Sequence, residues 1–299
     1  MEEKHPLHPR PQRRYDMGVI MSPPTPAFAR PRVMGIVNVT PDSFSDGGRH
    51  ATFEAALALA RRLIAEGADI LDVGGESTRP GAEPVPADVE AHRVVPVIAA
   101  IRAESAIPLS VDTMKPQVAR AAVAAGASLW NDVTALAHAA DSLATAAELG
   151  CEVVLMHMQG DPRSMQHAPA YGDVAAEVAE ALAARAQAAM AAGVARERIW
   201  LDPGVGFGKH RTRHNLPLIA HLDRLVALGF PVLLGVSRKS FIGALDPAGA
   251  GPRERLGGSI AAALAGAAAG VAALRVHDVR ETVQALAVDA AIRETRLPK

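Results

Sequence analysis

The chain has 299 residues, 49% of them hydrophobic, which is enough for one domain with a large buried core. Its 31 basic and 32 acidic residues give a formal net charge of −1, so composition offers no general reason to expect a nucleic-acid or membrane partner. A single cysteine, Cys151, excludes an internal disulfide and is typical of a reduced, cytoplasmic protein with a buried, inert thiol. No apolar run reaches the roughly 18 residues of a membrane span, and the N-terminus lacks the apolar stretch of a secretory signal.

The first part of the chain differs from the rest in composition. Seven prolines lie between Pro6 and Pro31 inclusive, with basic residues among them. Proline removes backbone donors and blocks helix formation, so we predict that residues 1–30 form an extended, disordered tail. Residues 31–299 are then expected to form a single catalytic domain. Composition leaves open whether the tail is a basic docking arm or a passive extension.

From residue 32 onward, short apolar runs alternate with longer stretches of helical periodicity. The runs of strand length are Val33–Val37, Ile70–Val73, Pro108–Val111, Ser128–Asn131, Val153–Met156, Ile199–Leu201, Val232–Val236 and Ala273–Val276. Apolar residues recur at helical spacing in Thr52–Ala65 and Asp278–Ala290, and a further helix is expected over Ile260–Ala269.

Strands without polar alternation are typical of a parallel sheet that is buried on both faces. Their alternation with helices indicates βαβ crossovers, and eight such units favour closure into a barrel. We therefore predict an α/β protein, a (β/α)8 TIM-type barrel in a single domain. A doubly wound open sheet is the alternative, although no GxGxxG motif opens a helix near the start.

In a β/α barrel, ligands meet the carboxyl ends of the strands, so the residues after each apolar run are informative. The last two runs carry basic groups, namely Arg238 and Lys239 after one, and Arg275 and His277 at the end of the other. Glycines at 257 and 258 then lead into a helix whose free N–H groups could also bind an anion. This pattern indicates a phosphate or pyrophosphate site, and a merely solubilising basic rim is the alternative.

The middle runs end in acid and amide side chains instead. Asp112, Asn131 and Asp202 each follow or close an apolar run, and no histidine or cysteine cluster has zinc spacing. Two carboxylates and an amide suit a flat heterocycle that offers both donors and acceptors. A glycosidase acid and base pair is the other interpretation, but a neutral sugar needs no basic cluster.

Several motifs at these positions resemble those of the dihydropteroate synthase family. The similarity extends from about Val33 to the C-terminus, and it is carried by Asn38–Gly48, Asp202–Gly204, Gly206–Lys209, Ser237–Ser240 and Arg275–Asp278. The resemblance implies a folate-pathway transferase that joins 4-aminobenzoate to (7,8-dihydropterin-6-yl)methyl diphosphate, releasing pyrophosphate and forming 7,8-dihydropteroate. It also implies Mg²⁺ as cofactor, a homodimer, and inhibition by sulfonamides.

The resemblance assigns roles to individual residues. Pterin binding falls to Asp112, Asn131, Asp202, Lys239, Met156, Phe207 and Gly235. The diphosphate falls to Asn38, Arg275 and His277, with Asn38 also placed near the metal. The aminobenzoate site is expected to comprise Thr78, Arg79, Pro80, Phe207 and Ser240. The residues expected to take part in catalysis are Asn38, Asp42, Arg79, Lys239, Arg275 and His277.

Some assignments stay open on the sequence alone. Loops Thr40–Gly48 and Gly74–Gly81 are hypothesised to close over the reacting centre. His157 could face the pterin or support its own loop, and Lys209 could contact ligand or be a surface charge. The basic loop 210–214 is expected to face solvent. A pterin-dependent methyltransferase barrel and a non-catalytic paralogue remain the alternative functions.

Overall fold

The structure is a computed structural model, and it describes residues 30–40, 48–77, 82–160, 164–249 and 251–295. Eight parallel strands form one sheet in the order β6-β5-β4-β3-β2-β1-β8-β7. Their bounds are β1 Arg32–Asn38, β2 Ile70–Gly74, β3 Leu109–Asp112, β4 Leu129–Asp132, β5 Glu152–Met156, β6 Ile199–Asp202, β7 Leu233–Leu234 and β8 Ala273–Val276. Each predicted run thus contains or overlaps a strand of the sheet.

The two edges of the sheet meet and close it into a barrel. Leu201 of β6 forms a parallel bridge with Val232, just before β7. The Leu201 N–H also donates to the carbonyl of Pro231 at 2.9 Å. The predicted (β/α)8 barrel is therefore confirmed, and the open doubly wound sheet is wrong. The seventh strand is shorter than the predicted Val232–Val236: it ends at Leu234, and the chain then turns at Arg238, whose φ is +59°.

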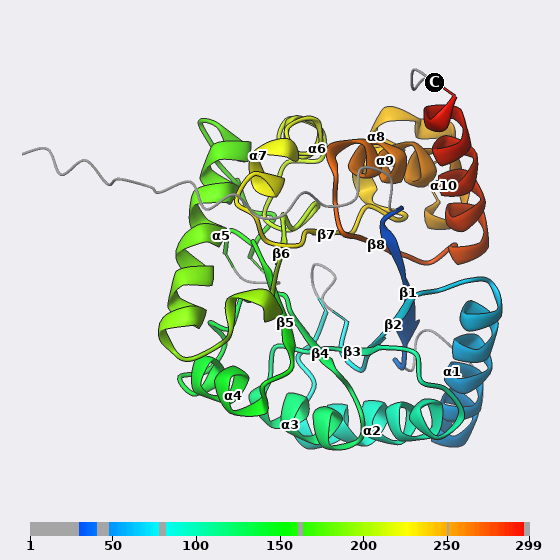
Figure 1. Cartoon of the computed structure of the whole chain (residues 1–299), viewed down its shortest axis with the longest axis vertical. Helices are drawn as coiled ribbons and strands as arrows, with labels where there is room; N and C mark the ends of the chain where they lie inside the picture. Colours follow the sequence, from blue (N-terminus) through cyan, green and yellow to red (C-terminus); the bar gives the residue numbers. More distant parts are fainter. Residues whose placement is uncertain (1–29, 41–47, 78–81, 161–163, 250, 296–299) are drawn as a thin grey trace, which may run out of the picture.

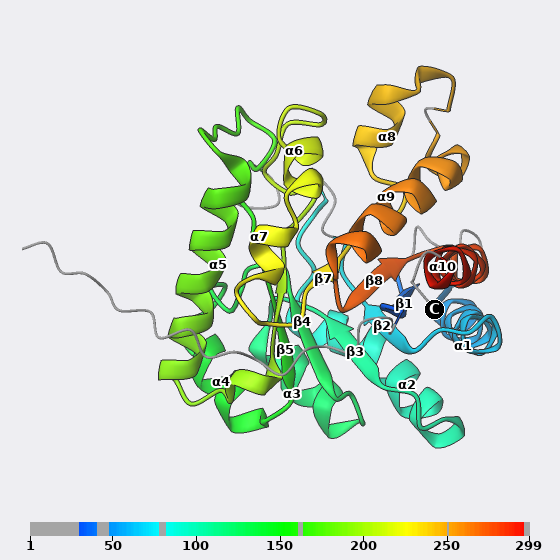
Figure 2. The ribbon, with the colours of Figure 1, turned by 45° about the horizontal axis from the view of Figure 1, so that its top comes forward.

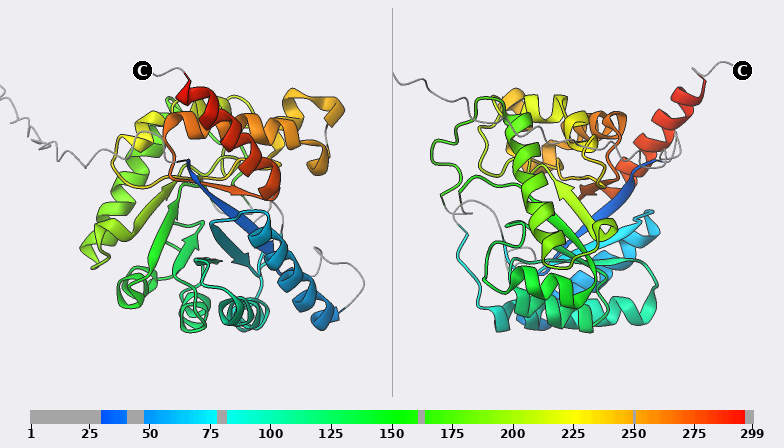
Figure 3. Two further views of the ribbon diagram at one scale, coloured as in Figure 1. Left: turned by 45° about the vertical axis from the view of Figure 1, so that its right-hand side comes forward. Right: turned by 60° about the vertical axis from the view of Figure 1, so that its left-hand side comes forward.

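Helices surround the strands on the outside, as Figure 1 shows. Their bounds are α1 Gly48–Ala65, α2 Ala87–Glu104, α3 Pro116–Ala124, α4 Ser142–Leu149, α5 Val174–Ala191, α6 Asn215–Ala220, α7 Asp223–Val226, α8 Ser240–Leu245, α9 Leu256–Ala269 and α10 Val279–Glu294. Helices α9 and α10 cover the ring on the side opposite α2 and α3, whereas α8 projects away from the strands (Figures 2 and 3). Within the described part of the chain, no helix is long and apolar enough to cross a membrane.

Two apolar layers stabilise the barrel. A small cluster fills its interior, and its members are Met34, Ile70, Leu129, Val154, Trp200, Leu233 and Ala273. A much larger cluster lies between the outward strand faces and the helices, and it includes Val33 and Leu71 of the strands together with Leu63 of α1. Cys151 belongs to this outer layer and is 8% exposed, and burial raises the pKa of its thiol. The expected buried thiol is confirmed.

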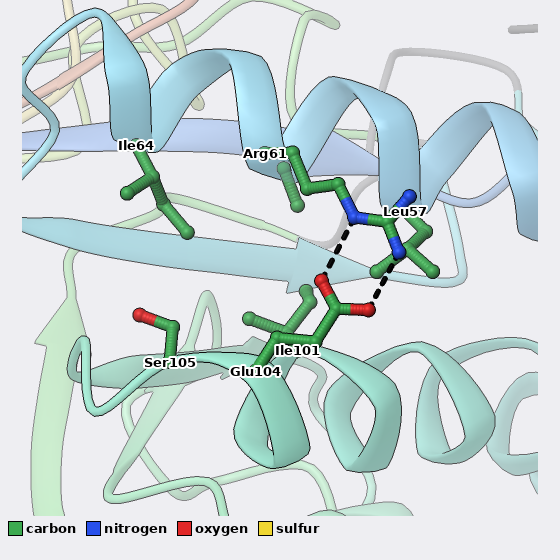
Figure 4. A pocket seen from close by; sticks show the side chains of 7 residues that line it. Leu57, Arg61, Ile64, Ile101, Glu104 and Ser105 are labelled. Carbon is green, nitrogen blue, oxygen red and sulfur yellow. Dashed lines mark hydrogen bonds and ion pairs between the residues drawn. The ribbon is translucent and has the colours of Figure 1, made fainter.

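Neighbouring helices are joined mainly by this apolar packing. Figure 4 shows an exposed ion pair between α1 and α2, in which Arg61 Nε lies 2.8 Å from Glu104 Oε2. Beneath it, Leu57 and Ile101 are almost completely buried. Exposed ion pairs are screened by water and salt and add little stability. Burial of the leucine and isoleucine therefore accounts for most of the attachment between these two helices.

Candidate active site at the carboxyl ends of the strands

The inner apolar layer determines which side chains reach the mouth of the barrel. Alternate residues of a strand face the same side, so a residue two positions beyond an inward-facing one also points inward. Two residues after the inner-layer positions 70, 129, 154, 200, 233 and 273 come Asp72, Asn131, Met156, Asp202, Gly235 and Arg275. Asn38 lies four residues after Met34. The two-residue alternation that directs the apolar side chains into the barrel therefore also directs these polar side chains inward at its mouth.

Strand register places the acid and amide residues side by side. Asn38 pairs with Gly74, Gly74 with Asp112, and Asp112 with Asn131. A Cβ atom on Gly74 would lie 3.4 Å from Asp112 Cβ and 3.8 Å from Asn38 Oδ1. The glycine therefore leaves space between the amide of Asn38 and the carboxylate of Asp112.

Arg275 extends across the barrel from β8 and contacts two carboxylates. Its Nε lies 2.6 Å from Asp72 Oδ2, and its Nη2 lies 2.6 Å from Asp112 Oδ2. Asn131 Nδ2 donates to the same Asp72 oxygen at 3.3 Å. Asp72 is completely buried and was missed as a site residue by the sequence reasoning. Its inward register, two residues after Ile70, is the signal that could have found it.

Asp112 and Asp202 are difficult to ionise. Burial raises the pKa of Asp112 to about 7, and the charge of Arg275 opposes that rise. Burial likewise raises the pKa of Asp202, although a hydrogen bond from the Gly204 N–H at 2.7 Å favours its charged form. The ionisation of both carboxylates therefore depends on the cations beside them.

Lys239 and Phe207 form one wall of the site. Lys239 Nζ lies 4.2 Å from the centroid of the Phe207 ring, which is within cation–π range. Burial lowers the pKa of Lys239 to about 8, whereas the charge of Asp202 opposes that change. Beyond Gly235 the space is open, since the nearest atom to an added Cβ would be Arg275 Cβ at 4.0 Å. Met156, 4% exposed, pairs in register with Asp202.

His277 is held as a neutral imidazole. Ser237 Oγ accepts from the His277 backbone N–H at 3.2 Å and lies 3.0 Å from its Nδ1. Burial, with the charges of Arg238 and Arg275, lowers the pKa of His277 to about 3. The Ser237 hydroxyl has one hydrogen and two lone pairs, so it can donate to a neutral Nδ1 while it accepts from the backbone. In that tautomer the ring hydrogen is on Nε2, and His277 is a neutral donor rather than a cation.

Arg238 stabilises the turn after β7. Its Nε and Nη2 lie 3.0 and 2.5 Å from the two carboxylate oxygens of Asp278. Its backbone N–H donates to Ser259 Oγ, and its carbonyl accepts from Arg255 Nη1 at 3.0 Å. The basic cluster expected from the sequence is thus divided, because the guanidinium of Arg238 is engaged by Asp278 while Arg275 and Lys239 reach the barrel mouth.

A buried ion-pair network supports the loop after β2. Lys115 donates to Glu76 and, at 2.5 Å, to Glu90, whose side chain is completely buried. Burial raises the pKa of Glu90, and the hydrogen bond from Lys115 opposes this. Glu76 Oε1 also accepts from the Val85 N–H at 3.0 Å. The network fixes the first residues of this loop. The sequence did not predict this network, because its three side chains lie far apart in the chain.

Several predicted residues are not placed beside these groups. Asp42, Thr78, Arg79 and Pro80 lie outside the described residues, as do residues 41–47 of the first loop expected to close over the site and residues 78–81 of the second. Ser240 is the exposed first residue of α8. Among the residues that the structure describes, no three His, Cys, Asp or Glu side chains form a metal-binding group. The amide oxygen of Asn38 is a hard ligand of the kind that Mg²⁺ accepts alongside water and phosphate oxygens.

Comparison with known proteins agrees with this geometry. The model of the pterin-binding enzyme family matches residues 34–277. The dihydropteroate synthases of Escherichia coli K12 and Neisseria meningitidis serogroup B are 48% and 50% identical to the chain, covering 87% of it and 91% and 92% of their own lengths. The structure of Xanthomonas albilineans dihydropteroate synthase with 4-aminobenzoic acid superposes with a TM-score of 0.84 at 55% identity, covering 90% of this chain and 94% of the other.

A barrel whose mouth offers buried carboxylates, an amide and cations matches the class of pterin-binding enzymes, and the family model covers the region that carries all of these groups. The relatives named above are all dihydropteroate synthases, and each matches this chain over nearly its whole length. The chain belongs to the dihydropteroate synthase family.

Proposed function

We propose that this chain condenses (7,8-dihydropterin-6-yl)methyl diphosphate with 4-aminobenzoate to give 7,8-dihydropteroate and pyrophosphate, as a transferase of folate biosynthesis. The observation that carries the proposal is the convergence of Asp112, Asn131, Asp202 and Lys239 with Arg275 at one end of the barrel. The structures of Xanthomonas albilineans dihydropteroate synthase with 4-aminobenzoic acid and with 7,8-dihydropteroate support the same substrate and product for this chain.

The pterin is proposed to bind among the buried acid and amide groups. An ionised carboxylate accepts two hydrogen bonds from a ring N–H and its neighbouring amino group, which is a role for Asp112 or Asp202. Asn131 supplies one donor and one acceptor, and Lys239 donates to a ring or carbonyl acceptor. Met156 and Phe207 are proposed to contact the flat faces of the heterocycle, and Gly235 leaves room for its edge.

The diphosphate is proposed to lie against Arg275, His277 and Asn38. Breaking the C–O bond leaves the electron pair on pyrophosphate, so donors at these positions stabilise charge that increases in the transition state. His277, whose pKa burial lowers, is proposed to donate from Nε2 as a neutral imidazole. Mg²⁺, held by the Asn38 oxygen and the substrate, would supply additional positive charge for the leaving group.

The new C–N bond forms when the aniline nitrogen attacks the methylene carbon that pyrophosphate leaves. The amine proton departs to solvent or to pyrophosphate, so no strongly basic side chain is required. The aminobenzoate is proposed to bind near Phe207 and Ser240, together with Thr78, Arg79 and Pro80. Asp42 and Arg79 are proposed to act at the reacting centre. Water must be excluded there because it would capture the same carbon.

A homodimer and a cytoplasmic location belong to the proposal as well. Val288 and Ile292 lie one turn apart on α10 and are 55% and 49% exposed, which supports a surface that a second copy could cover. A free cysteine thiol is typical of a reducing compartment. The proposed partners are otherwise the two small-molecule substrates alone.

The alternatives fit the observations less well. A pterin-dependent methyltransferase releases no pyrophosphate, so it has no need for donors such as Arg275 and His277 around a departing anion. A non-catalytic paralogue has no reason to retain Asp112, Asp202 and Lys239 in a costly buried arrangement. Identity near 50% to named synthases also favours the synthase reaction.

Pyrophosphate release tests the function. Purified protein is mixed with Mg²⁺ and both substrates, and each component is omitted in turn. We expect full release only in the complete mixture, and loss of release in Asp202→Asn. Asp223→Asn, which removes an exposed carboxylate on α7, is the matched control and should retain activity. Absence of release from folded wild-type protein in the complete mixture would overturn the proposal.

A further inference from the structure

Lys209 is a buried lysine in the loop between β6 and α6. Its side chain is 1% exposed, and its Nζ lies 3.0 Å from His157 Nδ1 and 3.1 Å from the His157 carbonyl. The same Nζ contacts the carbonyls of Gly204 at 3.0 Å and Phe207 at 2.9 Å. An ammonium has three hydrogens, so these four acceptors satisfy it completely. Lys209 is therefore neither a surface charge nor a residue with hydrogens left over for a ligand.

The contacts of Lys209 join two loops that approach each other through their backbones. A Cβ on Gly204 would lie 1.9 Å from the His157 carbonyl oxygen, and a Cβ on Gly208 would lie 2.4 Å from the Gln159 backbone carbonyl oxygen. Both glycines also have positive φ, +65° and +58°, a conformation that other residues rarely adopt. Larger residues are therefore excluded both by steric overlap and by backbone conformation. Carbonyl oxygens that converge so closely repel one another unless a cation lies among them. The ammonium of Lys209 occupies that position.

Other side chains hold the same loop from outside. The Gly206 N–H donates to Asn215 Oδ1 at 2.8 Å, and its carbonyl accepts from Gln166 Nε2 at 2.8 Å. Tyr171 donates its hydroxyl to the Gly208 carbonyl at 2.8 Å, and the ring of His214 packs edge-on against it. With the two bonds from Lys209, the carbonyls at 204, 206, 207 and 208 all accept from side chains. Such a loop has one defined conformation.

The conformation of this loop determines the wall of the active site. Phe207 lies within it and places its ring 4.2 Å from Lys239 Nζ. An added Cβ on Gly206 would lie 3.3 Å from Lys239 Cδ, so the stem of Lys239 packs along the loop backbone. Asp202 comes directly before the loop and accepts from the Gly204 N–H. The charge of Lys209 acts to lower the pKa of Asp202, after the larger effects of burial, of the Gly204 hydrogen bond and of the charges of Lys239 and Arg275.

We propose that Lys209 is a positioning residue for pterin binding. Its ammonium holds the loops after β5 and β6 together, and thereby places Phe207 and Lys239 against the heterocycle without touching it. His157 is part of the same assembly, as the acceptor that completes the ammonium's shell. This inference rests on the proposed function, because it assigns Phe207 and Lys239 to the pterin.

Isothermal calorimetry with a free pterin that lacks the diphosphate separates positioning from simple structural support. The stoichiometry reports the competent fraction of the protein, and Kd reports the geometry of the site. For Lys209→Met we expect Kd to weaken about 10- to 100-fold at near wild-type stoichiometry, the range for lost support of a binding group. Tyr171→Phe, which releases only the Gly208 carbonyl, should weaken binding less. Arg211→Met removes an exposed cation from the same loop and should match wild type.

A wild-type Kd in Lys209→Met would overturn the inference, whether or not the stoichiometry falls. Lys209→Gln retains two N–H donors and serves as the second variant if the methionine variant does not fold. A wild-type Kd in the glutamine variant would count against the inference equally. Failure of the wild-type protein to bind the free pterin would instead contradict the proposed function, so the two failures are distinguishable.

Discussion

Nη2 of Arg275 lies 2.6 Å from Oδ2 of Asp112, across the mouth of the barrel from β8 to β3. The residue proposed for the pyrophosphate and a residue proposed for the pterin therefore share an ion pair. Arg275 is also held by the fully buried Asp72. The two halves of the site are consequently coupled, and a change at Arg275 is expected to affect both.

Arg275→Met should lose turnover and pterin affinity together. Removal of the guanidinium leaves Asp72 and Asp112 without their shared cation, and breaking a buried ion pair costs about 3–5 kcal/mol of stability. Urea unfolding and pterin calorimetry measure the two effects. Arg275→Lys keeps the positive charge but cannot contact Asp72 and Asp112 through two separate nitrogens, so it should recover only part of the stability. Wild-type pterin affinity in the methionine variant would show that Asp112 acts independently of Arg275.

Pterin affinity should decrease as pH falls through neutrality. The pKa of Asp112 is raised by burial to about 7, and only its ionised form accepts two hydrogen bonds from the heterocycle. Protonation below that pKa therefore removes an acceptor. Calorimetric Kd values on both sides of neutrality test this, with Asp112→Asn as the variant in which the dependence should become weaker. The loss of the Arg275 charge in Arg275→Met should move the midpoint to higher pH.

Lys115→Met should be strongly destabilising. Lys115 is 14% exposed and neutralises Glu76 and Glu90, so its removal leaves two buried carboxylates, at a cost of about 3–5 kcal/mol. Chemical denaturation measures the change. The double variant Lys115→Met/Glu90→Gln should recover part of the loss, because one buried charge is removed. Arg61→Met breaks an exposed ion pair and should change stability little. Equal effects of the two single substitutions would contradict the role of burial.

Sulfonamides that carry a 4-amino group should compete with 4-aminobenzoate. Both share an aniline ring with a polar para group, and a Yersinia pestis relative, 46% identical, has been solved with a sulfonamide drug. Initial rates at several concentrations of each compound should show inhibition that saturating 4-aminobenzoate removes. The concentration of the pterin substrate is held high as the control. Inhibition that persisted at saturating 4-aminobenzoate would place the drug at another site.

The arrangement of strands was largely predictable from local pattern. Ala273–Val276 was predicted with the bounds that the structure has, and the other runs overlap their strands. Strand formation in a parallel barrel depends on short apolar runs, which are visible in the chain itself. The same period of two carries Asn131 and Asp202 to the mouth, directly above the inner apolar layer. The seventh run was predicted too long because its end depends on the turn at Arg238, which Asp278 and Ser259 stabilise.

Pairing between distant side chains depended on the tertiary structure alone. Arg275 and Asp72 are 203 positions apart, and Lys209 and His157 are 52 apart. No local pattern specifies such partners, because they meet only when strand register and barrel closure bring together the strands and loops that contain them. Composition and period therefore determined which residues face the site. Strand register decided that Arg275 contacts both halves of that site. The close approach of the loops after β5 and β6 decided that Lys209 is buried beside the loop that contains Phe207.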